Sequence, residues 1–192
     1  CPFSAHPRRD VTGEIFGAFR ARGFGVGAYF SKPDWHCPDY WWPYFPPFDR
    51  NANYSIAKHP ERWQRFKSFT RGQIRELLSN YGPLDILWLD GGWVKPRNPP
   101  RPCGLNPEGQ DIDMPSIAAM ARALQPGLII VDRDVPGRYE NYRTPENQVP
   151  DAPLEFVWET CMPMATSWSY VSTDTYKPAR ELIHLLVDIV AK

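Results

Sequence analysis

Residues 85–93 read Asp-Ile-Leu-Trp-Leu-Asp-Gly-Gly-Trp, and this stretch decides the fold. An apolar run of strand length ends in a carboxylate, Asp90, and two glycines then let the backbone turn away sharply. Trp88 and Trp93 flank this carboxylate. A charged group at the end of a buried parallel strand is how a sheet presents a reactive oxygen to a pocket. We therefore expect a catalytic site at Asp90.

The rest of the chain alternates between helix and strand patterns. Apolar residues at helical spacing, with glycine or proline near the ends, predict helices at 10–22, 60–80, 114–124 and 177–191. Continuous apolar runs predict strands at 24–30, 84–90, 128–131 and 155–160. Strands that alternate with helices and are apolar throughout indicate a parallel sheet that is buried on both faces. The predicted fold class is therefore α/β.

Two parallel architectures fit this alternation. An open doubly wound sheet requires a glycine-rich phosphate loop after a strand, but the glycines of residues 23–27 fall within an expected strand. A (β/α)8 TIM-like barrel has polar and aromatic residues at the carboxyl ends of successive strands. Such residues occur at 29–35, 88–93, 132–134 and 158–160. We expect about four strands of a barrel, truncated at both ends, with the remaining strands outside this chain.

Composition excludes several classes of function. Lys plus Arg and Asp plus Glu both number 22, so no basic excess is available to neutralise nucleic acid. The longest apolar run, near 182–191, is interrupted by His184 and Asp188 and is shorter than the roughly 18 residues of a membrane span. The four cysteines and four histidines lack the spacing of a zinc site. We expect no nucleic acid partner, no membrane span and no metal.

A carboxylate beside tryptophan favours carbohydrate chemistry, because aromatic rings pack against the apolar faces of sugars. Retaining glycosidases also need a second carboxyl group, about 5–5.5 Å from the first. Glu146, in the loop after the third expected strand, and Glu159, at the end of the fourth, are the candidates. Each has a structural alternative, as a solvated loop residue or a buried hydrogen-bonded carboxylate, and Asp90 could instead cap a turn. Position in the sequence does not separate the two glutamates.

Six short motifs follow one another along the chain. They are Gly-Ala-Tyr-Phe-Ser at 27–31 with Asp-Trp at 34–35, Leu-Trp-Leu-Asp-Gly at 87–91, Val-Asp-Arg at 131–133, Thr-Pro-Glu at 144–146, Trp-Glu-Thr-Cys at 158–161 and Ser-Trp-Ser-Tyr at 167–170. In this order they resemble the family 29 α-L-fucosidases, from about residue 10 to the end of the chain. The resemblance identifies residues 1–192 as part of a catalytic (β/α) barrel domain.

The resemblance implies a retaining exo-α-L-fucosidase that hydrolyses terminal fucose from fucosylated glycans, with no metal or organic cofactor. Asp90 matches the nucleophile of the family. Glu146 matches the acid/base of several members, and Glu159 is the reserve acid/base because the Thr-Pro-Glu loop differs in other members. The resemblance also implies export to the periplasm or the medium for a bacterial protein and a lysosomal location for an animal one.

The expected substrate-binding residues lie in these motifs or next to them. By resemblance, Trp88 lines the fucose pocket and Arg133 contacts the sugar or the nucleophile. Tyr29, Trp35 and Trp93 complete the expected set. The paired histidines of the family, which bind fucose hydroxyls, have no counterpart, since none of the four histidines stands in a pair. We attribute this difference to truncation.

Two other functions remain open from the sequence. The aromatic residues of the loop at 35–44 would also suit a non-catalytic carbohydrate-binding barrel, which needs neither Asp90 nor a second acid at pocket distance. A barrel glycosidase acting on another sugar is the third hypothesis.

Overall fold

The computed structural model describes residues 5–97, 106, 109–133 and 135–192, so Asp134 of the third expected strand end lies outside the described residues. In chain order, the described elements are α1 (Val11–Arg20), β1 (Gly27–Ser31), α2 (Pro60–Asn80), β2 (Ile86–Asp90), α3 (Met114–Leu124), β3 (Ile129–Asp132) and α4 (Ala179–Ala191). The expected helices are confirmed, and α2 and α3 match their expected bounds at both ends.

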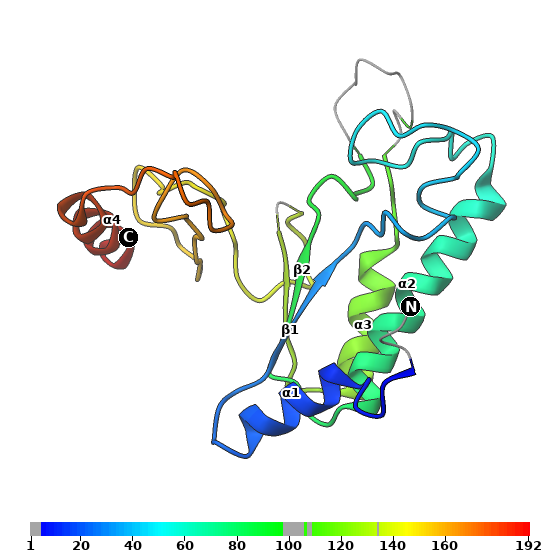
Figure 1. Ribbon diagram of the computed structural model, residues 1–192, viewed down its shortest axis with the longest axis horizontal. Helices are drawn as coiled ribbons and strands as arrows, with labels where there is room; N and C mark the ends of the chain where they lie inside the picture. The colour runs from blue at the N-terminus through cyan, green and yellow to red at the C-terminus, as the bar shows by residue number, and fades with distance from the viewer. Residues whose placement is uncertain (1–4, 98–105, 107–108, 134) are drawn as a thin grey trace.

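The three strands form one parallel sheet in the order β1-β2-β3. Tyr29 is paired with Trp88, and Trp88 with Val131. The helix between each pair of strands returns the chain to the same end of the sheet, so all three carboxyl ends lie together (Figure 1). The α/β prediction is confirmed to this extent.

One face of the sheet is covered by α2 and α3, which pack against each other (Figure 1). Pro60 begins α2, where its missing N–H would have no helical partner in any case. The residues that α2 buries are Trp63, Phe66, Thr70, Ile74 and Leu78. They recur every three or four residues and so form a single stripe along the helix. Phe69 lies on the same helix but outside this stripe, and it is 42% exposed.

The opposite face of the sheet is more open than the sequence predicts. In β2, Leu87 and Leu89 are fully buried on the side of the helices. Trp88 and Asp90, which alternate with them, are only half-buried. This alternation contradicts the expectation that both faces are buried. Because side chains alternate across a strand, Trp88 and Asp90 share the open face.

The fourth expected strand, at 155–160, does not form, and this prediction is wrong. The structure instead has two isolated parallel bridges, between Arg143 and Trp158 and between Glu146 and Cys161. Both bridges join residues with the same separation in sequence, so the two segments run alongside each other in one register. They do not make a continuous ladder.

Pro145 explains the interruption. The amide of Arg143 donates to the carbonyl of Val157 at 3.0 Å. Further along, the amide of Asn147 donates to the carbonyl of Cys161 at 3.1 Å. A parallel ladder would place one more bond between these two, from residue 145, and proline has no N–H to donate. The ladder is therefore broken directly before the candidate acid.

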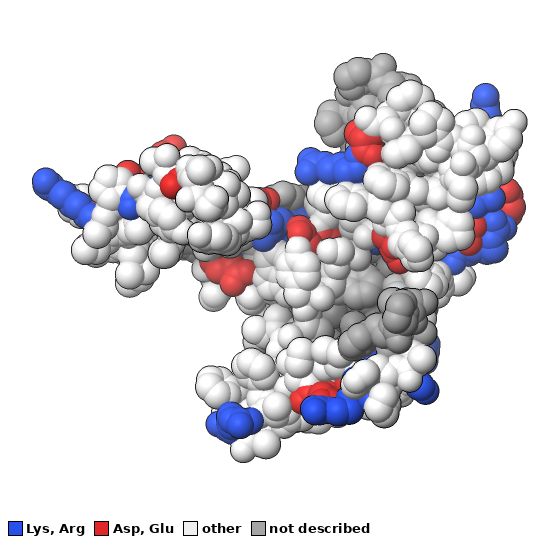
Figure 2. All heavy atoms as spheres, in the orientation of Figure 1, with Lys and Arg blue, Asp and Glu red and all other residues white. Residues whose placement is uncertain are grey.

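The helices at the two ends of the chain bury no residue completely. The apolar residues of α4 include Leu186 and Val190, and both are exposed. The periodicity therefore predicts the helix correctly, although its apolar face is open in this chain. No helix among the described residues is long and apolar enough to cross a membrane. Acidic and basic side chains are interspersed over the face seen in Figure 2.

Candidate active site

Asp90 ends β2 on the open face of the sheet. Its Oδ1 accepts the amide of Gly91 at 2.7 Å, and its Oδ2 accepts the hydroxyl of Tyr29. Gly91 has φ of +93°, and a Cβ at this position would lie 2.4 Å from Cδ of Pro33. A glycine is therefore required for the sharp turn that follows the carboxylate. The sequence prediction of a turning point after Asp90 is confirmed.

Arg133 follows β3 and connects the candidate catalytic groups. Its Nε lies 3.6 Å from Oδ1 of Asp90, and its Nη1 lies 3.0 Å from Oε2 of Glu146. Its Cζ is 4.5 Å from the centroid of the Trp88 ring, which packs against the guanidinium by a cation–π contact. One guanidinium thus contacts both carboxylates and the indole.

Glu159 occupies a different position beside the same indole. Its Oε1 accepts the Trp88 Nε1–H at 2.6 Å. Burial raises the pKa of Tyr142 to about 12, and the charge of Glu159 and a hydrogen bond to it act in the same direction. Glu159 is therefore held by Trp88 and Tyr142, whereas Glu146 is held by Arg133.

Tyr29 lies next to Trp88 across the β1–β2 pair, and the two rings stack with centroids 5.3 Å apart and planes 14° apart. Burial, the hydrogen bond to Asp90 and the Asp90 charge together raise the pKa of Tyr29 to about 12, and burial is the largest of these causes. The phenol is therefore neutral at physiological pH and acts as a donor to the carboxylate.

A cavity of about 430 Å³ opens beside Asp90. It is lined by Tyr29, Phe30, Ser31, Pro33, Asp34, Trp35, Gln73, Asp90, Gly91 and Trp93. The indole N–H groups of Trp35 and Trp93 both donate to the carbonyl of Arg50, at 3.0 and 3.1 Å. The Arg50 guanidinium stacks on Trp93, with Cζ 4.1 Å from the ring centroid. Both tryptophans are thus fixed by the long loop between β1 and α2.

A buried polar network that the sequence analysis missed lies at the same ends of the strands. Lys32, directly after β1, forms an ion pair with Asp132 at the end of β3, and both side chains are fully buried. The Tyr139 hydroxyl donates to the other oxygen of Asp132 at 3.0 Å. The amide of Lys32 donates to the carbonyl of Asp90 at 2.9 Å. Desolvation lowers the pKa of Lys32, and the Asp132 charge acts in the opposite direction.

This network ties the ends of the outer two strands together around Asp90, the end of the middle strand. A lysine one residue after a strand carries no sequence signal of burial, because lysine is normally exposed. Only the pairing of β1 and β3 on either side of β2 brings Lys32 to Asp132.

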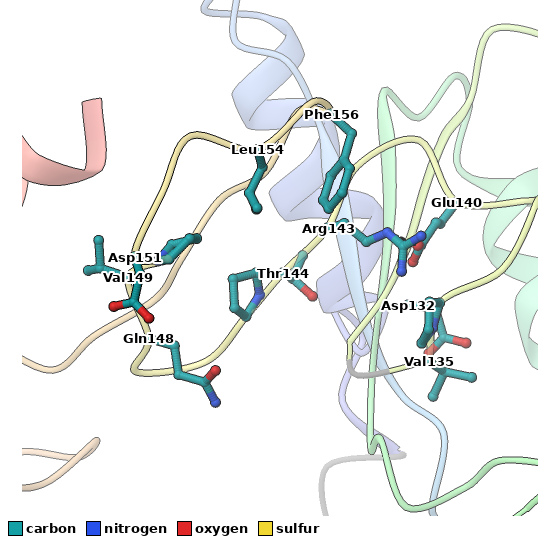
Figure 3. Close-up of a pocket in the computed structure, with 13 residues that line it drawn as sticks. Asp132, Val135, Glu140, Arg143, Thr144, Gln148, Val149, Asp151, Leu154 and Phe156 are labelled. Carbon is teal, nitrogen blue, oxygen red and sulfur yellow. Dashed lines mark ion pairs between the residues drawn. The ribbon is translucent and has the colours of Figure 1, made fainter. Parts of the chain in front are cut away.

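A second cavity, of about 440 Å³, lies among the loops that follow β3 (Figure 3). Arg143 and Glu140 form an ion pair there at 2.7 Å, and Thr144 and Phe156 also line the cavity. None of the three candidate catalytic carboxylates lines it. The structure therefore separates this cavity from the cluster around Arg133.

Among the described residues, no group of three or more His, Cys, Asp or Glu side chains is arranged to hold a metal ion. Cys37 and Cys161 are free thiols. The sequence analysis gave Cys161 no role, yet its sulfur accepts a hydrogen bond from Nη2 of Arg133 at 2.9 Å. Cys161 follows Glu159 by two residues, so in an extended segment the two side chains lie on the same side. This spacing could have indicated that Cys161 lies near the site.

Two solved structures of alpha-L-fucosidases are similar to nearly the whole of this chain. The alpha-L-fucosidase isoenzyme 1 from Paenibacillus thiaminolyticus superimposes with a TM-score of 0.70 and 28% identity over 96% of this chain and 45% of that one. The alpha-L-fucosidase AlfC from Lactobacillus casei, solved with its alpha-L-fucose product, gives a TM-score of 0.64 and 22% identity over 98% of this chain and 57% of that one. The second similarity shows the fold alone. This chain spans about half the length of these relatives.

Sequence comparison agrees with the structures. A rice protein named as a candidate alpha-L-fucosidase is 34% identical over 82 residues, which are 43% of this chain and 12% of that protein. The sequence profile of the alpha-L-fucosidase family matches residues 2–192. The chain therefore belongs to the alpha-L-fucosidase family.

Proposed function

We propose that the protein is a retaining exo-α-L-fucosidase, and that this chain forms part of its (β/α)8 barrel. In this proposal Asp90 is the nucleophile and Glu146 is the acid/base. The observation that carries it is the single guanidinium of Arg133, which contacts Asp90 at 3.6 Å and Glu146 at 3.0 Å. Membership of the family supplies the reaction class and fucose as the substrate.

Glu146 is favoured over Glu159 by what each carboxylate contacts. Glu146 shares the guanidinium with Asp90, so the two carboxylates lie on one cationic group. One oxygen of Glu159 is engaged by the Trp88 indole, and its other neighbour is the Tyr142 phenol. These contacts suit a residue that fixes the Trp88 indole, on which the Arg133 guanidinium packs. Glu159 is thus assigned a supporting role.

The first chemical step forms a covalent intermediate. The Asp90 carboxylate attacks the anomeric carbon of an α-L-fucoside, and the bond from that carbon to the leaving oxygen breaks. Glu146, as a carboxylic acid, gives its proton to the departing oxygen. The product is a fucosyl ester on Asp90 with inverted configuration. Arg133 and the Tyr29 hydroxyl keep the attacking carboxylate oriented before the step.

The second step releases fucose. Glu146, now a carboxylate, takes a proton from water while the water oxygen attacks the anomeric carbon. The ester bond to Asp90 breaks, and the second inversion restores the original configuration. The ion pair between Arg133 and Glu146 corresponds to this ionised state of Glu146. Trp35, which lines the cavity beside Asp90 and is exposed, offers an aromatic face for the substrate during both steps.

The test is hydrolysis of 4-nitrophenyl α-L-fucoside by the full-length protein, followed by proton NMR of the released sugar. We expect turnover and α-L-fucose as the first anomer formed. Release of the β-anomer first would contradict the retaining mechanism. Turnover of other aryl glycosides without turnover of the fucoside would support the rival hypothesis of a different sugar. Sugar binding without any turnover would support the carbohydrate-binding barrel.

A further inference from the structure

Cys161 contacts both the arginine and the acid loop. Its Sγ accepts a hydrogen bond from Nη2 of Arg133 at 2.9 Å. Its backbone pairs with Glu146 in an isolated bridge, and its carbonyl accepts the amide of Asn147 at 3.1 Å. The residue is therefore attached to the guanidinium and also to the segment that carries the candidate acid.

The guanidinium of Arg133 depends on such a partner for its orientation. Its Nε is buried and has no hydrogen-bond partner among the described residues, because Asp90 lies 3.6 Å away. The two remaining nitrogens are directed to different groups, Nη1 to Glu146 and Nη2 to Cys161. A planar group held at two points and packed on the Trp88 ring has a fixed tilt. If the sulfur is removed, the contact between Nη1 and Glu146 is the one of the two that remains.

A neutral thiol suits this position. Burial raises the pKa of the Cys161 thiol, while the positive charge of Arg133 acts in the opposite direction. A neutral sulfur accepts a weak hydrogen bond and adds no charge. A third carboxylate at this position would compete with Asp90 and Glu146 for the same cation. The thiol orients the guanidinium and leaves its charge available to the two carboxylates.

We propose that Cys161 is a positioning residue that orients the Arg133 guanidinium between Asp90 and Glu146. This inference rests on the proposed function and adds a residue that the reaction does not touch directly. Serine at this position keeps a neutral acceptor of similar size, whereas alanine removes it. Cys37, the other described free thiol, lies in the loop between β1 and α2 and provides a control for the loss of a thiol.

The kinetic arm uses the full-length protein with 4-nitrophenyl α-L-fucoside. Cys161→Ala should lower kcat about tenfold with little change in KM, because a hydrogen bond to a charged group is lost. Cys161→Ser should recover most of this loss, and Cys37→Ala should stay within about twofold of the wild type. In an Arg133→Ala background, Cys161→Ala should have no further effect, since the two residues act as one unit. Independent losses that multiply would overturn the proposal.

A second arm does not depend on activity. The Nε–H resonance of Arg133, assigned by its disappearance in Arg133→Lys, reports the order of the guanidinium. We expect a sharp signal in the wild type and in Cys161→Ser, and a broadened or averaged signal in Cys161→Ala. An equally ordered Arg133 in Cys161→Ala would overturn the positioning role. A wild-type protein without fucosidase activity but with this NMR pattern would contradict the proposed function alone.

Discussion

The described residues within 26–133 and residues 141–192 are held together in different ways. In the first region, three strands pair in continuous register, and Leu87 and Ile130 are fully buried beneath two helices. In the second, two single bridges replace a ladder, and α4 buries no residue completely. Asp90 lies on the first region and Glu146 on the second. The two proposed catalytic carboxylates therefore differ in how firmly the chain holds them.

This difference suits the two chemical roles. A nucleophile must meet one carbon in one geometry, so a strand end within a packed sheet is an appropriate support. The acid/base must first reach a leaving oxygen and then a water molecule at the same place. A segment whose ladder is interrupted at Pro145 has fewer fixed hydrogen bonds and more freedom to make that adjustment. Arg133, on the packed region, is the contact that joins them.

The largest effect is expected from Asp90→Gly. Removal of the nucleophile should lower kcat on an aryl fucoside by about a thousandfold or more. Added azide should restore part of the rate by attacking the anomeric carbon in the space that the carboxylate leaves. The checks are the rate with and without azide and the appearance of a fucosyl azide. Asp90→Asn should lose the same activity without azide rescue, and near wild-type turnover by Asp90→Gly would contradict the assignment.

Glu146→Ala should have the next largest effect, and it depends on the leaving group. Loss of the acid should slow substrates with poor leaving groups about a hundredfold or more, while good aryl leaving groups are affected much less. Glu159→Ala, the same change at the second glutamate, should show no such dependence. The measurement is kcat/KM for a series of aryl fucosides. If the Glu159 variant showed the leaving-group dependence and the Glu146 variant did not, Glu159 would be the acid/base. The proposed contrast between the supports of the nucleophile and of the acid/base would then no longer rest on Glu146.

Stability should separate the two regions through one matched pair of substitutions. Leu87→Ala should cost about 2–5 kcal/mol, because Leu87 is 0% exposed and its removal leaves a cavity. Leu186→Ala should change stability by less than about 0.5 kcal/mol, because Leu186 is 62% exposed. Denaturant unfolding of the two variants provides the comparison. A similar cost at both positions would mean that the exposed face of α4 is covered as the protein folds.

The smallest effect concerns Tyr29, on the packed side of the site. Asp90→Asn should lower the pKa of Tyr29 from about 12 toward 10.0, because a charge and a hydrogen bond that favour the phenol are lost. Burial, the largest cause, persists, so the return should be partial. Ultraviolet titration against Tyr29→Phe isolates this group. An unchanged titration in Asp90→Asn would show that the Tyr29 to Asp90 contact is absent in solution.

The same raised pKa predicts the pH dependence of stability. Between pH 10.0 and about 12 the unfolded chain releases the Tyr29 proton while the folded chain retains it. The contribution of Tyr29 to stability is therefore complete below pH 10.0 and declines as the pH rises through this range. Tyr29→Phe should show a flatter decline in the same window.

Local signals predicted the packed region well. The apolar spacing and Pro60 located α2, and Met114–Leu124 was found from its periodicity. The sequence failed where burial depends on distant partners. Phe156 and Val157 have the composition of a strand, but Val157 is 72% exposed, and strand formation there depends on a donor that Pro145 lacks.

The sequence predicted which residues belong to the candidate site better than it predicted the contacts between them. Motif order assigned Asp90, Trp88 and Arg133 to one site, and in the structure Arg133 contacts both of the other two residues. The contact of Arg133 with Glu146 depends on the path of a long loop, which leaves no local signal in the sequence. The Lys32 ion pair was missed for a related reason, since it joins residues 100 positions apart in the chain.

The strand order β1-β2-β3 also matters while the chain is being synthesised. Each new strand pairs with the strand made immediately before it, and the helix between them is already complete by then. The sheet can therefore grow at one edge as residues leave the ribosome, without opening an existing strand pair. Lys32 is synthesised early but has no ion-pair partner until the third strand, which ends in Asp132, has left the ribosome. Closure of that ion pair would be a natural marker that the nascent site has assembled.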